Sequence, residues 1–147
     1  MGLLDGVQEQ LLRYRNRTFL KAAMAASALT AYADGRVTLS ERYRIDDIVS
    51  TLEQLRVYDP RKAAQILDEF LYALRDAPEE ARRVLIGKLE RIAADREAAE
   101  LIVRIALSVC KSDGAVVSAE RAQFAEICDV LGFKVEDFDL DDAEPQS

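Results

Sequence analysis

Apolar residues recur every three to four positions along most of the chain, which is the spacing of an amphipathic helix. The pattern predicts helices that start near residues 17, 38, 60, 78, 95 and 118, and a short helix over residues 3–12 would add a seventh. The segment 95–111 is apolar on several faces, so we expect it at the centre of a bundle. With no long linker between these segments, the sequence predicts one all-α domain of about six to seven helices.

Local signals support several of these starts. In "TLSE", Thr38 and Glu41 have the spacing of a capping box, with Thr38 as the N-cap. Asp59 and Pro60 mark the next start, because proline suits the first helical position. Gly132 follows the last apolar residue of the final helix, where glycine commonly ends a helix.

A ten-residue pattern occurs twice, as "ADGRVTLSER" at 33–42 and "SDGAVVSAER" at 112–121. The matching pairs, each 79 residues apart, are Asp34 with Asp113, Gly35 with Gly114, Val37 with Val116, Glu41 with Glu120, and Arg42 with Arg121. In both copies a predicted helix ends at the Asp-Gly pair and the next helix carries the Glu. The repeat predicts two pseudo-symmetric helix-loop-helix halves, with two further helices between them.

Two interpretations of the repeated acids remain open. Local structure explains most positions: the glycines suit left-handed C-caps, and Glu41 and Glu120 fall in first helical turns, where a negative charge is worth about 0.3–1 kcal/mol. Asp34 and Asp113 follow helix C-termini, where an anion is unfavourable unless an Asx-type turn or a cation offsets it. Together the four carboxylates would suit a divalent ion: Ca²⁺, Mg²⁺, Mn²⁺ or Zn²⁺. The spacing is not that of an EF-hand.

Charge is spread unevenly along the chain. Its net charge is -7, and residues 134–147 hold six acids against one lysine, so we divide it into a helical domain, 1–133, and an acidic tail, 134–147. Deletion from Phe138 onward is expected to leave the melting temperature nearly unchanged. The basic residues Arg13, Arg15, Arg17 and Lys21 suit a solvated helix face better than a phosphate surface, and the acidic isoelectric point argues against nucleic acid.

The sequence offers little for catalysis. It has no histidine, P-loop or dinucleotide-binding glycine motif, and Cys110 and Cys128 lie among apolar residues, as small buried side chains do. We therefore expect a non-enzymatic protein with no redox cysteine. It has neither an apolar run long enough for a membrane span nor a signal-peptide pattern, which predicts a cytoplasmic location.

Several stretches together resemble the TerB family of tellurite-resistance proteins along essentially the whole chain. They are "RYRNRTFLKAAMAASALTAYADG", "LRVYD", "KSDG", and "LGF" before "EDFDL". The resemblance implies an all-helical fold of pseudo-repeated halves and a cytoplasmic bacterial stress protein. It also implies a metal site in the duplicated loops, made of Asp34, Glu41, Asp113 and Glu120.

Two functions follow from these observations. In the first, the chain binds a divalent ion between its halves and so sets its surface for a partner. In the second, it is a metal-free adaptor that docks other tellurite-resistance or stress proteins at the cytoplasmic membrane face, where the resemblance implies an integral-membrane partner. Neither version involves nucleic acid, and the oligomeric state is left open.

Overall fold

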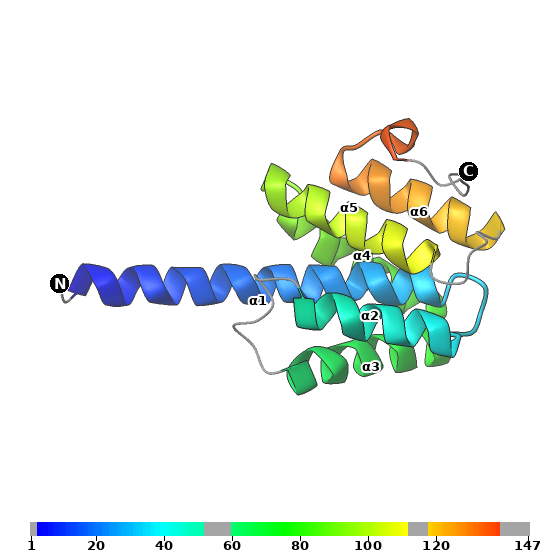
Figure 1. Cartoon of the computed structure of the whole chain (residues 1–147), viewed down its shortest axis with the longest axis horizontal. Coiled ribbons are helices and arrows are strands. Elements are labelled where there is room, and N and C mark those ends of the chain that lie inside the picture. Colours follow the sequence, from blue (N-terminus) through cyan, green and yellow to red (C-terminus); the bar gives the residue numbers. More distant parts are fainter. Residues whose placement is uncertain (1–2, 52–59, 112–117, 139–147) are drawn as a thin grey trace.

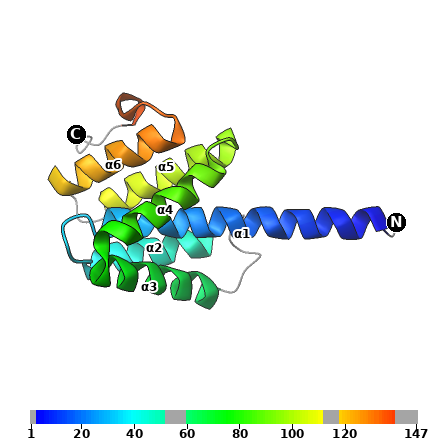
Figure 2. The same ribbon diagram turned by 180° about the vertical axis from the view of Figure 1, so that it is seen from behind.

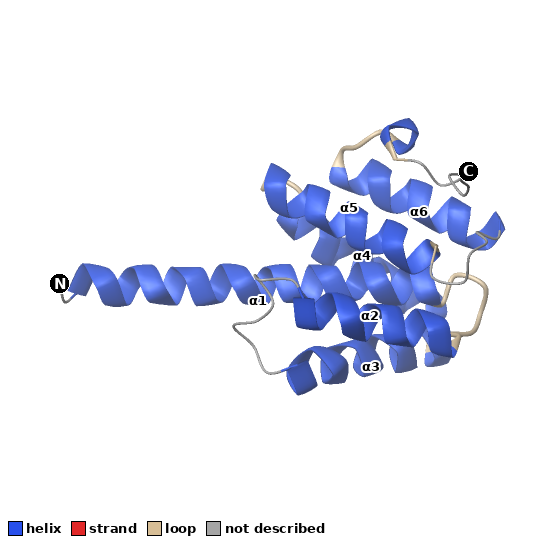
Figure 3. Cartoon of the chain, viewed as in Figure 1, coloured by secondary structure: helices blue, strands red, loops and turns tan. Residues whose placement is uncertain are grey.

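The computed structural model describes residues 3–51, 60–111 and 118–138. These residues form helices and no strand, in one all-α domain, as the sequence predicted (Figures 1 and 3). The elements are α1 (Leu3–Ala31), α2 (Leu39–Thr51), α3 (Pro60–Asp76), α4 (Pro78–Ile92), α5 (Arg96–Cys110), α6 (Ser118–Leu131) and the 3₁₀ turn η2 (Val135–Asp137).

The N-terminal region is a single helix where the sequence predicted two. α1 is continuous from Leu3 to Ala31. The residues that would have separated the pair, "RYRNR" at 13–17, contain neither glycine nor proline, and arginine is a good helix former. Nothing therefore ends the helix between the two predicted segments.

The central helix is α1, so the prediction that 95–111 would be central is wrong. α1 contacts every other α-helix, and α2 and α3 lie on one side of it with α5 and α6 on the other, while α4 crosses behind (Figures 1 and 2). Every residue from Ala22 to Ala31 is buried. Alanine side chains are small enough to let neighbouring helices approach on all faces, whereas α5 keeps an exposed side that includes Glu97 and Arg104.

The predicted capping box is confirmed at the start of α2. Thr38 Oγ1 accepts a hydrogen bond from the Glu41 N–H at 3.1 Å, and Glu41 Oε1 accepts from the Thr38 N–H at 2.9 Å. This reciprocal pair satisfies two backbone donors at the helix end. α5 has a similar start, since the Asp95 carboxylate accepts from the Ala98 N–H at 3.2 Å.

The C-terminal end of the described chain folds back onto α6. Gly132 has φ +81° and ends that helix, as predicted. The Phe138 ring then meets the rings of Phe124 and Phe133 edge to face, each with centroids 6.1 Å apart. Phe138 is therefore part of the packed domain, which corrects the expectation that deletion from this residue onward leaves the melting temperature nearly unchanged.

Two sequence-based expectations concern larger features. The pseudo-symmetry of the two halves stays a prediction, because the second repeat loop, 112–117, lies outside the described residues. In the described segments, no helix is long and apolar enough to cross a membrane.

Candidate functional site

The first repeat loop leaves α1 through a glycine turn. The Gly35 N–H donates to the Tyr32 carbonyl at 2.9 Å, and Gly35 has φ +93°, in the left-handed region. The predicted role of Gly35 as a left-handed cap is confirmed, because a side chain would strain this backbone. Val37 packs against the core after the turn. Their repeat partners, Gly114 and Val116, lie outside the described residues.

Asp34 is exposed at the tip of this turn. Its Oδ1 accepts from the Arg36 N–H at 3.4 Å, which is the long form of an Asx-type turn. The local explanation offered for this acid is therefore present in the structure. A hydrogen bond of this length is a weak one, and the carboxylate faces solvent, where an ion could reach it.

The two repeated glutamates are buried, which their sequence positions did not indicate. Glu41 is 2% exposed and Glu120 is 5% exposed, although both stand in the first turn of a helix. Glutamate is almost never fully buried without a partner. Glu41 has one in the capping box, where its Oε1 accepts from Thr38.

Cys110, at the end of α5, is hydrogen-bonded to one of these glutamates and feels the charge of both. The Cys110 thiol donates to the backbone carbonyl of Glu120, with Sγ and O 3.9 Å apart. Burial raises the pKa of Cys110 to about 12, and the negative charges of Glu120 and Glu41 add to the increase. The glutamates of the two repeat copies, far apart in sequence, thus both act electrostatically on one buried thiol.

Both cysteines are packing residues, as predicted. Cys110 and Cys128 are each 1% exposed and neither forms a disulfide. Burial raises the pKa of Cys128 to about 11. The contact of the Cys110 thiol with Glu120 was missed, although the position of Cys110 just before the second repeat loop was the available signal.

The four predicted ligands are thus only partly placed. Glu41 and Glu120 are both buried, Asp34 is exposed on the first repeat loop, and Asp113 lies outside the described residues. Across 3–51, 60–111 and 118–138, no group of three or more histidine, cysteine, aspartate or glutamate residues is arranged to hold a metal ion. A complete site would therefore need a donor from the loop at 112–117.

The model of the tellurite resistance protein TerB family matches residues 20–142. The chain belongs to the TerB family. The TerB match includes both copies of the repeat and begins at Leu20, in the buried part of α1. Proteins of the TerB family are generally not catalytic. No curated protein and no solved structure matches the chain.

Proposed function

We propose that this TerB-family protein is a non-enzymatic stress protein that binds a divalent metal ion between its two repeat loops. Its ligands would be Asp34, Glu41, Asp113 and Glu120. The observation that carries the proposal is the burial of Glu41 and Glu120, one from each copy of the repeat, whose negative charges both raise the pKa of the Cys110 thiol.

A cation would offset the cost of burying these two carboxylates. Taking a charged group out of water is unfavourable, and two like charges near each other add to that cost. Carboxylate oxygens are the ligands that Ca²⁺, Mg²⁺ and Mn²⁺ prefer, and Zn²⁺ also accepts them. Because Glu41 Oε1 is engaged by the Thr38 N–H, its Oε2 is the oxygen left for an ion.

Thermal melts of single variants test this proposal. Glu41→Gln keeps the capping box, because glutamine serves the same position, and removes the charge. We expect this variant and Asp34→Asn and Asp113→Asn to melt at or above the temperature of the unaltered protein in chelator. Added ion should stabilise the unaltered protein, by about 2.7 kcal/mol at a hundredfold excess over Kd, and the variants much less.

Glu79→Gln is the matched control for Glu41→Gln. Glu79 is also an acid in the first turn of a helix, but it is exposed on α4. Its variant should respond to ions like the unaltered protein. If neither the melting temperature nor the native mass of the unaltered protein changes on addition of Ca²⁺, Mg²⁺, Mn²⁺ or Zn²⁺, the metal hypothesis is wrong.

A metal-free adaptor is the second candidate, and an exposed apolar pair favours it. Leu39 and Tyr43 are 71% and 67% exposed, and they stand one turn apart on α2 next to the first repeat loop. Such a pair suits a partner surface better than water. The partners would be other tellurite-resistance or stress proteins, including an integral-membrane protein at the cytoplasmic membrane face.

Co-purification of tagged protein from cells exposed to tellurite tests the adaptor. We expect Leu39→Ser with Tyr43→Ser to reduce recovery of the other tellurite-resistance proteins severalfold, with an unchanged circular dichroism spectrum. Val84→Ser is the control, because Val84 is also exposed and apolar but lies on α4. Equal recovery with the double variant and the unaltered protein would exclude this surface.

A further inference from the structure

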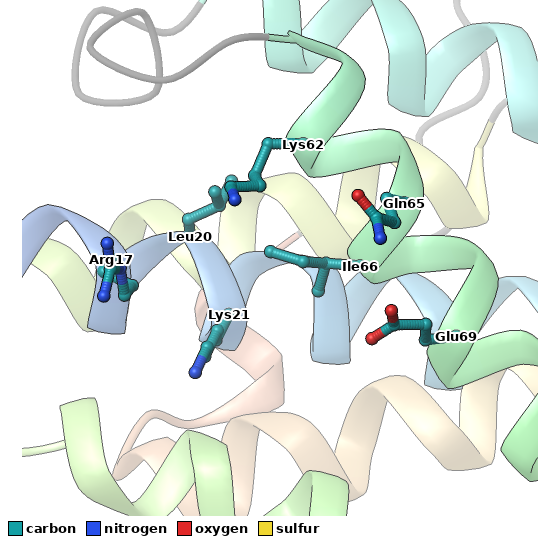
Figure 4. A pocket seen from close by; sticks show the side chains of 7 residues that line it. All are labelled: Arg17, Leu20, Lys21, Lys62, Gln65, Ile66 and Glu69. Carbon is teal, nitrogen blue, oxygen red and sulfur yellow. The ribbon is translucent and has the colours of Figure 1, made fainter.

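Two adjoining grooves lie on the face formed by α1, α3 and α4, and basic side chains surround both. The first groove, of about 320 Å³, is lined by Arg17 and Lys21 of α1 and by Lys62 of α3 (Figure 4). The second, of about 290 Å³, is lined by the same two α1 residues and by Lys88 and Arg91 of α4. Arg17 and Lys21, one turn apart, thus form a ridge common to both grooves.

The charge of this face is opposite to that of the whole chain. Five cations line the two grooves with a single acid, Glu69, although the net charge of the chain is -7. Within the described residues, no ion pair or hydrogen bond neutralises any of these five side chains. The basic face therefore carries positive charge that no acid in the described segments neutralises, in a molecule that is acidic as a whole.

Three cations of the second groove are close enough to repel one another. The pKa of Lys88 is lowered, first by burial and then by the positive charges of Lys21 and Arg91. Lys88 is half-buried, while the other four cations are exposed. A bound anion would relieve this repulsion and would return the pKa of Lys88 towards its usual value.

We propose that the paired grooves bind a ligand that carries at least two phosphate groups, one in each groove, with Arg17 and Lys21 between them. Guanidinium groups bind phosphate through two parallel hydrogen bonds, and lysines add point charge. The groups can belong to a soluble phosphate chain or to neighbouring lipid headgroups. Figure 4 shows Lys62, Ile66 and Glu69 pointing from α3 towards α1. Ile66 and Leu20 also line the first groove, which therefore has an apolar side.

Phosphate suits these grooves better than an acidic peptide. Each groove is small, about 320 Å³ and 290 Å³, and is lined by three or four cations. A phosphate can hold two negative charges in one compact group, whereas a peptide spreads single carboxylates over several residues. The sequence had placed Arg17 and Lys21 on a solvated helix face, and the structure adds the cations of α3 and α4 to them.

Isothermal titration with pyrophosphate and with ATP, in metal-free buffer at low salt, tests the soluble source. Sedimentation with phosphatidylcholine vesicles, with and without phosphatidylglycerol, tests the lipid source. Lys21→Gln with Arg91→Gln should weaken binding at least about tenfold, because two charge-assisted contacts are lost. Binding should also weaken as salt rises.

Arg83→Gln with Lys134→Gln is the control pair, because it makes the same change in net charge at exposed sites outside both grooves. We expect less than a twofold effect from it. Binding of pyrophosphate or ATP alone would assign a soluble ligand, and binding only of phosphatidylglycerol vesicles would assign a lipid. The proposal is overturned by no binding of either kind, by equal losses in the two pairs, or by tighter binding of poly-glutamate. The metal-free buffer keeps this outcome independent of the repeat loops.

Discussion

At the scale of single residues, the most informative side chains are polar groups buried in an apolar bundle. Glu41, Glu120 and Thr30 are each at most 5% exposed. This burial could not be predicted from the sequence, because acids in a first helical turn and threonines in a helix are usually solvated. Burial depends on where neighbouring helices lie, which is a tertiary property that periodicity does not contain.

The two thiols should be unreactive in the folded protein. At pH 8 an aromatic disulfide reagent is expected to label Cys110 and Cys128 only at the rate of unfolding, because both are buried and have a pKa of about 12 and about 11. Both should react at once in denaturant. Rapid labelling without denaturant would mean that the end of α5 opens in the native state.

A cysteine-free variant extends this prediction to function. Cys110→Ala with Cys128→Ala should leave tellurite resistance largely intact, at a stability cost of about 1 kcal/mol for each position. Growth on tellurite, with protein abundance measured alongside, checks it. Loss of resistance in a variant that stays folded and abundant would show that a thiol takes part in the function.

Thr30 is a candidate for stabilisation. Its hydroxyl is buried and has no hydrogen-bond partner among the described atoms, so Thr30→Val should stabilise the protein by about 1 kcal/mol. Ser27→Ala is the control, since Ser27 Oγ donates to the Ala23 carbonyl at 2.9 Å and its loss should cost up to about 1 kcal/mol. Urea unfolding measures both. Destabilisation by Thr30→Val would indicate a partner for the hydroxyl.

At the scale of elements, sequence signals succeeded where a local cap fixes the helix end. The starts of α2 and α3 were predicted from Thr38 and Pro60, and each of these effects acts within one turn of the helix. The prediction failed for α1, where no local signal was present and the burial of alanines decided the packing. Alanine is only weakly apolar, so the alanine-rich α1 looked less hydrophobic than 95–111, and the sequence pattern predicted 95–111 as the central helix instead.

The contrast between local signals and tertiary packing also explains which candidate site residues could be predicted from the sequence. The repeat identified Glu41 and Glu120, because identical spacing is visible in the chain itself. The basic face was found only in part, because Arg17 and Lys21 lie far in sequence from Lys62, Lys88 and Arg91. Recognising this face requires the tertiary structure, in which α1 packs against both α3 and α4.

At the scale of the whole molecule, the boundary between the domain and its acidic tail can be placed by truncation. A chain that ends at Phe138 should melt within about one degree of the full chain, because the removed residues 139–147 are mostly polar and include four acids. A chain that ends at Asp137 should lose about 1–2 kcal/mol of unfolding free energy, because it lacks the Phe138 ring and its contacts with Phe124 and Phe133. Calorimetry of both chains measures the difference. Equal melting temperatures would show that the ring adds nothing to stability.

The long first helix also sets how far the molecule extends. In both views the N-terminal part of α1 runs beyond the other helices (Figures 1 and 2). A helix rises about 1.5 Å per residue, so deleting residues 1–12 should shorten the maximum dimension seen by small-angle X-ray scattering by up to about 18 Å. The full chain should therefore scatter as a globule with an attached rod, with a long tail in its pair-distance distribution. A partner held at the tip of that rod would stand clear of the first repeat loop and of the basic face.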